Sequence, residues 1–108
     1  MKELVEFLQQ KSIILKSLKS IPPRELGSRK RVDIYIGVDL KKYYVFILRI
    51  EKKSRFLQKD AKDMIELHQK AQKYIDSSIK KRYIIINAPL CSKAKALLLE
   101  SGWRVWSE

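Results

Sequence analysis

Several charged residues of the types that take part in catalysis lie within or at the end of two apolar segments of the sequence. Asp33 is set among β-forming residues in "VDIYIGV", and "FILRIEKKS" runs from apolar residues into Glu51 and Lys53. Residues two apart on a strand point the same way, so Glu51 and Lys53 project from one face, while Lys52 between them offers its backbone carbonyl. If the two segments pair, these groups and Asp33 are expected to converge.

Two carboxylates, a carbonyl and a lysine form a set that suits a hard divalent cation. Mg²⁺ takes oxygen ligands, and proteins usually hold it with one or two carboxylates together with substrate phosphate. Such an ion would neutralise a scissile phosphate and polarise a bound water. Lys53 would orient or help deprotonate that water and add positive charge near the developing oxyanion. The set therefore predicts phosphodiester hydrolysis with Mg²⁺, or with Mn²⁺ in its place.

The overall charge favours a polyanionic partner. The chain of 108 residues carries 24 Lys and Arg against 12 Asp and Glu, a net charge of +12. The longest unbroken apolar run, residues 43–48, is far too short to span a membrane, so nucleic acid is favoured over lipid. The expected phosphate contacts are Arg29, Lys30, Arg31, Arg49 and Arg55. Because phosphate contacts carry no sequence information, non-specific or structure-selective binding to double-stranded or branched DNA is expected.

Hydrophobic periodicity predicts one domain over residues 1–108. Apolar residues three and four apart predict an opening helix over 2–20, after which "IPP" and a basic loop over 22–31 lead into the core at 32–106. Alternation predicts strands over 32–38 and 43–54, joined as an antiparallel hairpin by "DLKK". A helix over 58–77, a buried strand at 82–86, a helix over 93–101 and a closing strand at 103–106 follow.

The order of these elements predicts an α/β fold. Strands separated by helices pair in parallel, whereas the hairpin pairs antiparallel. We therefore expect a mixed β-sheet flanked by helices, in the order helix, strand, strand, helix, strand, helix, strand.

An acid within one strand, followed after a hairpin by "EKKS" at the end of the next, resembles the Asp…Glu-x-Lys signature of the restriction endonuclease-like nucleases, the PD-(D/E)XK superfamily. Within that superfamily, roughly residues 31–106 are similar to small archaeal domains related to Holliday junction resolvases and Mrr-type enzymes. The resemblance implies a Mg²⁺-dependent DNA endonuclease, and it allows a homodimer.

The resemblance also implies a role for each matching residue. Asp33 and Glu51 would be metal ligands, Lys52 would lend its carbonyl, and Lys53 would be the family lysine. Many members add a catalytic acid from the opening helix, for which Glu6 or Glu3 is the candidate.

Arg49 departs from the family pattern. It stands two residues before Glu51, at an inward-pointing position that is usually apolar. An arginine there either binds phosphate or pairs with Glu51 and fills the metal site. Three hypotheses therefore stay open: an active endonuclease, a catalytically inactive nucleic-acid-binding protein on the same fold, and a basic structural or assembly protein with an acidic protein partner.

The other residues with chemical potential are expected to be structural. Cys91 is the only cysteine, which excludes an internal disulfide and a cysteine-based zinc site, so a buried or half-buried thiol is expected. His68 lies near the apolar border of a helix and is expected to be packed or hydrogen-bonded, and Asp39 fits a turn. The opening "MKELVEFLQQ" lacks the features of a secretory signal, so a cytoplasmic protein is expected.

Overall fold

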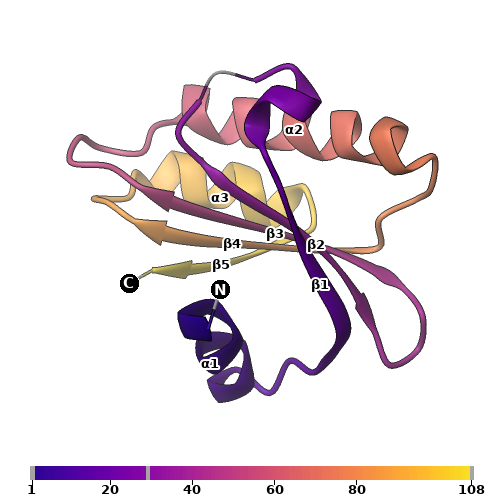
Figure 1. Cartoon of the computed structure of the whole chain (residues 1–108). Helices are drawn as coiled ribbons and strands as arrows, with labels where there is room; N and C mark the ends of the chain where they lie inside the picture. Colours follow the sequence, from indigo (N-terminus) through magenta and orange to yellow (C-terminus); the bar gives the residue numbers. More distant parts are fainter. Residues whose placement is uncertain (1, 29, 108) are drawn as a thin grey trace.

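A mixed five-stranded sheet lies at the centre of the molecule, with α1 on one face and α2 and α3 on the other (Figure 1). The computed structural model describes residues 2–28 and 30–107, with Lys2 and Glu3 described by their backbone alone. The helices are α1 (Lys2–Gln10), the short 3-10 helix η1 (Pro23–Leu26), α2 (Gln58–Ile75) and α3 (Ser92–Glu100). The strands are β1 (Leu15–Ile21), β2 (Asp33–Asp39), β3 (Tyr44–Glu51), β4 (Lys81–Asn87) and β5 (Trp103–Ser107).

The strands lie in the sheet in the order in which they occur in the chain. β1 with β2 and β2 with β3 pair antiparallel, whereas β3 with β4 and β4 with β5 pair parallel. The predicted α/β class, with a mixed sheet flanked by helices, is confirmed, and so are the hairpin and the parallel second half. This topology brings the first residue of β2 and the last residue of β3 to the same end of the sheet.

The prediction of a helix over residues 2–20 is wrong, because α1 ends at Gln10 and the next segment is the edge strand β1. Ser12 takes a positive φ of 61°, which no helix continues. A β-bulge between Leu15 and Ser17 then lets Leu15 and Leu18, three residues apart, pack on the same side of the sheet. The bulge reproduces the spacing of a helix within a strand, which explains the error.

Gly37 makes room for this bulge. A Cβ at Gly37 would lie 2.8 Å from the Ser17 carbonyl oxygen and 3.0 Å from Cδ1 of Leu15. Only glycine therefore lets β1 approach β2 so closely at this point.

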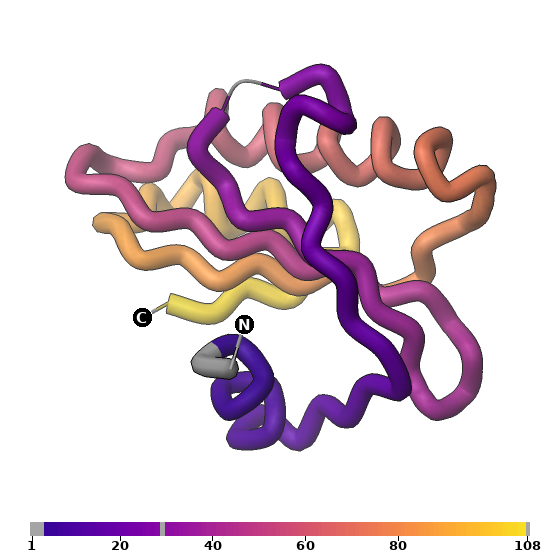
Figure 2. The backbone as a smooth tube through the Cα atoms, viewed as in Figure 1, coloured from indigo at the N-terminus to yellow at the C-terminus, as the bar shows by residue number. Residues whose placement is uncertain are grey.

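The two faces of the sheet carry two separate cores. On one face Phe46, Leu48 and Ile84 pack under α2 and α3. On the other face Val45, Ile47 and Ile85 pack against α1. Figure 2 shows α1 passing beside β5. The rings of Phe7 on α1 and Trp106 on β5 meet edge to face, with centroids 5.7 Å apart.

The predicted basic loop over 22–31 is more ordered than expected. Its proline pair begins η1, which Gly27 ends with a φ of 69°, and Leu26 is buried in the core under α2. This anchor fixes the path of the chain toward β2. Of the helices described, none is long and apolar enough to cross a membrane.

Candidate metal site and basic cleft at the ends of β2 and β3

Asp33 and Glu51 lie on the same face of two adjacent strands. In the β2–β3 register Asp33 is opposite Arg49, which places Glu51 one diagonal step further along β3. Both acids are exposed. Diagonal neighbours in an antiparallel pair have Cα atoms about 7–8 Å apart, within reach of two side chains that share one ion. The structure thus places these two predicted residues together at one end of the sheet, on the face that α1 covers.

Glu6, the candidate acid from the opening helix, lies on α1, and its role stays a prediction. Its side chain is exposed on α1, and the Glu3 side chain lies outside the described residues. Among residues 2–28 and 30–107, no group of three or more His, Cys, Asp or Glu side chains is arranged to hold a metal ion. Of the predicted metal ligands, the β2–β3 register brings together the two carboxylates of Asp33 and Glu51, and metal binding by them stays a prediction.

Arg49 lies beside this pair. It is half-buried and directly opposite Asp33, so the two Cβ atoms are expected to be about 4.5–5.5 Å apart. Tyr35 lies on the same face, and the charges of Asp33 and Arg49 both affect its pKa. Burial raises the pKa of the Tyr35 hydroxyl, the Asp33 carboxylate raises it further, and the Arg49 guanidinium lowers it. Arg49 thus contributes positive charge at the position where Asp33 would bind a cation.

The segment after β3 is held at both ends, and this fixes Lys53. The Lys52 N–H donates to the Asn87 carbonyl at 3.2 Å, and the Phe56 N–H donates to the Pro89 carbonyl at 2.8 Å. Phe56 is fully buried. Lys53 lies between these two anchors, is exposed, and lines the same cleft as Glu51.

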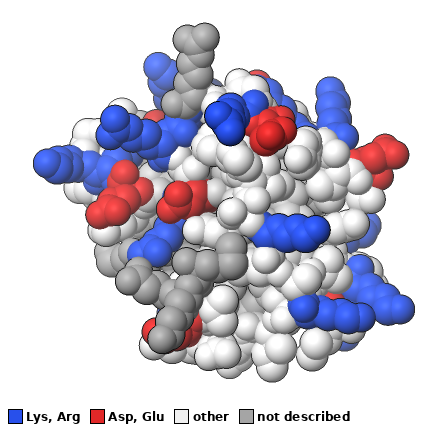
Figure 3. All heavy atoms as spheres, viewed as in Figure 1, with Lys and Arg blue, Asp and Glu red and all other residues white. Residues whose placement is uncertain are grey.

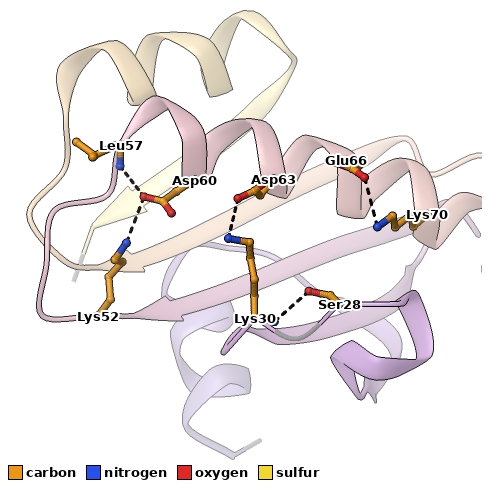
Figure 4. A network of polar contacts seen from close by, with 8 residues as sticks. All are labelled: Ser28, Lys30, Lys52, Leu57, Asp60, Asp63, Glu66 and Lys70. Carbon is orange, nitrogen blue, oxygen red and sulfur yellow. Dashed lines mark hydrogen bonds and ion pairs between the residues drawn. The ribbon is translucent and has the colours of Figure 1, made fainter.

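Asp60 ties the same segment to α2. One carboxylate oxygen, Oδ2, accepts the Leu57 N–H at 2.8 Å and the Lys52 ammonium at 3.2 Å (Figure 4). Burial would raise the pKa of Asp60, but these hydrogen bonds and the Lys52 charge outweigh it and hold the pKa below its ordinary value. Asp60 therefore caps the start of α2 and holds the residue whose carbonyl was predicted to bind metal.

A second pair repeats this arrangement one helical turn later. The Lys30 ammonium lies 2.7 Å from Oδ2 of Asp63 (Figure 4). The hydrogen bond to Asp63 raises the pKa of Lys30. Lys30 comes just before β2, so this ion pair ties α2 to the segment that leads into the strand beginning with Asp33.

These loops and α2 enclose a cleft of about 760 Å³ next to Glu51. Four of its eleven lining residues are basic, two are acidic and four are apolar. The lining residues are Lys30, Arg31, Val32, Ile50, Glu51, Lys52, Lys53, Phe56, Asp60, Met64 and Asn87. Figure 3 shows basic side chains gathered near this end of the sheet and again near the β2–β3 turn.

The residues predicted to contact nucleic acid lie in different parts of the structure. Lys30 and Arg31 line the cleft, Arg49 lies on the α1 face, and Arg55 is exposed outside the cleft lining. Arg29 lies outside the described residues. Asp60 and Asp63 are not among the predicted site residues, because Leu57 has no side-chain oxygen and so the usual sequence signature of a capping box is missing at this helix start.

His68, Cys91 and Asp39 were expected to be structural, and their surroundings agree with that expectation. His68 is buried, its Nε2 lies 3.3 Å from the Ile79 carbonyl, and burial lowers its pKa. Cys91 is half-buried just before α3, where the backbone N–H groups of Ala94 and Lys93 lower its pKa. The turn role of Asp39 is confirmed, since its Oδ1 accepts two backbone N–H groups of the hairpin.

No protein-family model matches the sequence, and no curated protein matches it either. Three solved structures resemble the chain over 99% of its length. EndoMS in its apo form has a TM-score of 0.61 at 12% identity, and a repair endonuclease from Pyrococcus abyssi has 0.57 at 15%. A complex of EndoMS with double-stranded DNA has 0.56 at 15%.

The chain covers 45%, 46% and 43% of these three structures, less than half of each. At such low identities the likeness establishes the fold alone. The chain therefore has an α/β fold shared with part of these endonucleases, in agreement with the nuclease-like fold expected from its sequence. The closer resemblance to Holliday junction resolvases and Mrr-type enzymes stays a prediction.

Proposed function

We propose that this chain is a DNA endonuclease domain that hydrolyses phosphodiester bonds with Mg²⁺ or Mn²⁺. The observation that carries the proposal is the placement of Asp33 and Glu51 on one face at one end of the sheet, where Glu51 and Lys53 also line a cleft that contains Lys30 and Arg31. The likeness in fold to endonucleases, one of them in complex with double-stranded DNA, supports the same class of activity.

The donor set fits a small divalent cation. Asp33 and Glu51 would each supply one carboxylate oxygen and Lys52 its carbonyl, leaving positions for water and a phosphate oxygen. When bound, the ion supplies charge neutralisation to the scissile phosphate and makes a bound water more acidic. Lys53 adds its ammonium charge beside the same phosphate and stabilises the oxyanion that develops there.

The basic residues around the cleft would position the substrate. Lys30 and Arg31 line the cleft from the segment before β2, and Lys52 and Lys53 line it from the segment after β3. Contacts of this kind neutralise phosphates and make affinity fall with salt, by about 0.9 in log K per log salt for each phosphate. We propose double-stranded or branched DNA as the substrate, and the homodimer implied by the family resemblance stays a prediction.

The experiment that tests this proposal is incubation of the purified chain with supercoiled plasmid and with a four-way junction. We expect nicking or cutting of at least one substrate with Mg²⁺ or Mn²⁺, and none with EDTA. A protein that binds both DNAs and cuts neither with either metal would refute the endonuclease proposal.

A second candidate function is DNA binding without cleavage, favoured by Arg49. A guanidinium opposite Asp33 competes with a metal ion for that carboxylate. If this candidate holds, the wild type binds DNA without cutting it, and Arg49→Leu gains Mn²⁺ binding, measured by electron paramagnetic resonance of the free ion. If the endonuclease proposal holds, Arg49→Leu instead lowers DNA affinity or cleavage.

A further inference from the structure

A hollow lies at the end of the sheet opposite Glu51, on the α1 face. Its volume is about 460 Å³. The segment from α1 to β1, the β2–β3 turn and the first residues of β4 and β5 surround it. The lining residues are Lys11, Ser12, Ile13, Ile14, Leu15, Asp39, Leu40, Lys41, Val45, Lys81, Tyr83 and Arg104.

Two aliphatic side chains on this rim are left in water. Leu40 is 66% exposed and Ile14 is 64% exposed, more than any other large hydrophobic side chain in the described part of the chain. Ile13, Ile14 and Leu15 also line a neighbouring groove of about 270 Å³ between α1 and β1. The apolar surface of Ile13, Ile14 and Leu15 therefore continues from the hollow into the groove.

The turn that presents Leu40 is held in one conformation. Oδ1 of Asp39 accepts the N–H groups of Lys41 and Tyr43, each at 2.9 Å. Oδ2 of the same carboxylate lies 2.9 Å from the Lys81 ammonium, which ties the turn to β4. A partner would not have to order this turn on binding, which lowers the entropic cost of association.

Four exposed cations surround the apolar residues: Lys11, Lys41, Lys81 and Arg104. Asp39 is the one acid among the lining residues described, so four positive charges and one negative charge leave the hollow at a formal +3. A second copy of this chain carries the same +12 and would be repelled. Nucleic acid fits poorly, because Ile14 and Leu40 offer no ring on which a base could stack.

We propose that this hollow binds a segment of a partner protein in which bulky apolar residues are flanked by Asp and Glu. The apolar residues would cover Ile14 and Leu40, and the carboxylates would meet the surrounding cations. The hollow and the proposed metal site lie at opposite ends of the sheet, so a partner there leaves Asp33 and Glu51 open to DNA. The proposal does not depend on the endonuclease activity.

The experiment is selection from a random peptide library displayed on phage, using the full chain as bait. We expect enriched peptides with bulky apolar residues between acids. Synthetic versions of these peptides should bind Ile14→Ser and Leu40→Ser about tenfold more weakly than wild type, and Lys41→Glu more weakly still. Leu99→Ser is the matched control, since Leu99 is 51% exposed on α3, across the sheet, and its loss should change nothing.

Circular dichroism of each variant separates loss of binding from loss of folding. Enrichment of basic or uncharged peptides would overturn the proposal, and so would binding that survives in Ile14→Ser and Leu40→Ser. Displacement of the peptides by duplex DNA would assign the hollow to nucleic acid. Self-association of the wild type that Leu40→Ser abolishes, measured by sedimentation, would assign it to a second copy.

Discussion

The Lys52 ammonium lies 3.2 Å from Oδ2 of Asp60, and that same oxygen accepts the Leu57 N–H at 2.8 Å. The Asp60 carboxylate therefore contacts both ends of the loop between β3 and α2. The loop carries Lys53, so the position of the proposed catalytic ammonium depends on a residue of the helix.

Removing the Asp60 carboxylate should destabilise the fold. Asp60→Ala leaves the Leu57 N–H without its acceptor, and we expect the free energy of unfolding to fall by about 1 kcal/mol, as for other lost helix caps. Glu66→Ala is the matched control, because Glu66 lies on the same helix in a surface pair with Lys70. That pair is worth about 0.5 kcal/mol or less. Urea denaturation followed by circular dichroism measures both, and equal losses would contradict the capping role.

The charge of Asp60 should make stability depend on pH. Its pKa in the folded protein is below the ordinary value of 3.8, so the carboxylate stabilises the fold at neutral pH and this contribution disappears as pH falls below 3.8. Asp60→Asn keeps an oxygen for the Leu57 N–H but loses the charge. The difference in unfolding free energy between wild type and Asp60→Asn should therefore shrink from pH 7 toward pH 3. A constant difference over that interval would show that the ion pair with Lys52 adds no stability.

Gly37 should be intolerant of any side chain. Gly37→Ala would place a Cβ against the Ser17 carbonyl and Leu15, so we expect the free energy of unfolding to fall by about 1–3 kcal/mol, as in an overpacked core. Ser20→Ala, at an exposed position further along β1, is the control and should change little. Thermal unfolding measures both variants. A Gly37→Ala protein as stable as wild type would mean that β1 does not approach β2 through this bulge.

Part of the fold follows from local pattern, and part does not. Alternating apolar residues predicted β2 and most of β3, because strand periodicity is a local property, but β3 ends at Glu51 rather than at residue 54, so Lys53 lies in the loop that follows and not on the strand face of Glu51. That Asp33 and Glu51 share a face depends on the β2–β3 register, which the local pattern left open. β1 was missed because a bulge gives Leu15 and Leu18 the spacing of a helix. The position of Glu6 relative to the sheet depends on how α1 packs, a contact between distant segments that no local pattern encodes.

The acids of α2 illustrate the same limit. Asp60 and Asp63 resemble solvent-exposed helix residues in the sequence, and only the tertiary fold brings them to Lys52 and Lys30. Charged residues on a helix can therefore contact a site even when the local sequence gives no sign of that contact.

Releasing Lys30 from Asp63 should strengthen DNA binding. Asp63→Asn frees the Lys30 ammonium for a phosphate, and because an exposed ion pair is worth up to about 1 kcal/mol, affinity should rise by up to about fivefold. The slope of log K against log salt should steepen by about 0.9. Glu66→Gln removes the same charge from α2 but faces Lys70 instead of the cleft. Fluorescence anisotropy with a duplex measures both, and an equal gain in Glu66→Gln would show that net charge alone is responsible.

If Asp33 and Glu51 act on DNA through one divalent ion, single-turnover cleavage of a labelled DNA should depend on both carboxylates and on the Mg²⁺ concentration. We predict that wild type and the control Glu66→Gln cut at a rate that rises with Mg²⁺ and reaches a plateau. Asp33→Asn and Glu51→Gln should each lose at least about a hundredfold in rate while still binding the DNA. Cleavage by either variant at the wild-type rate, or cleavage by wild type in EDTA, would contradict this mechanism.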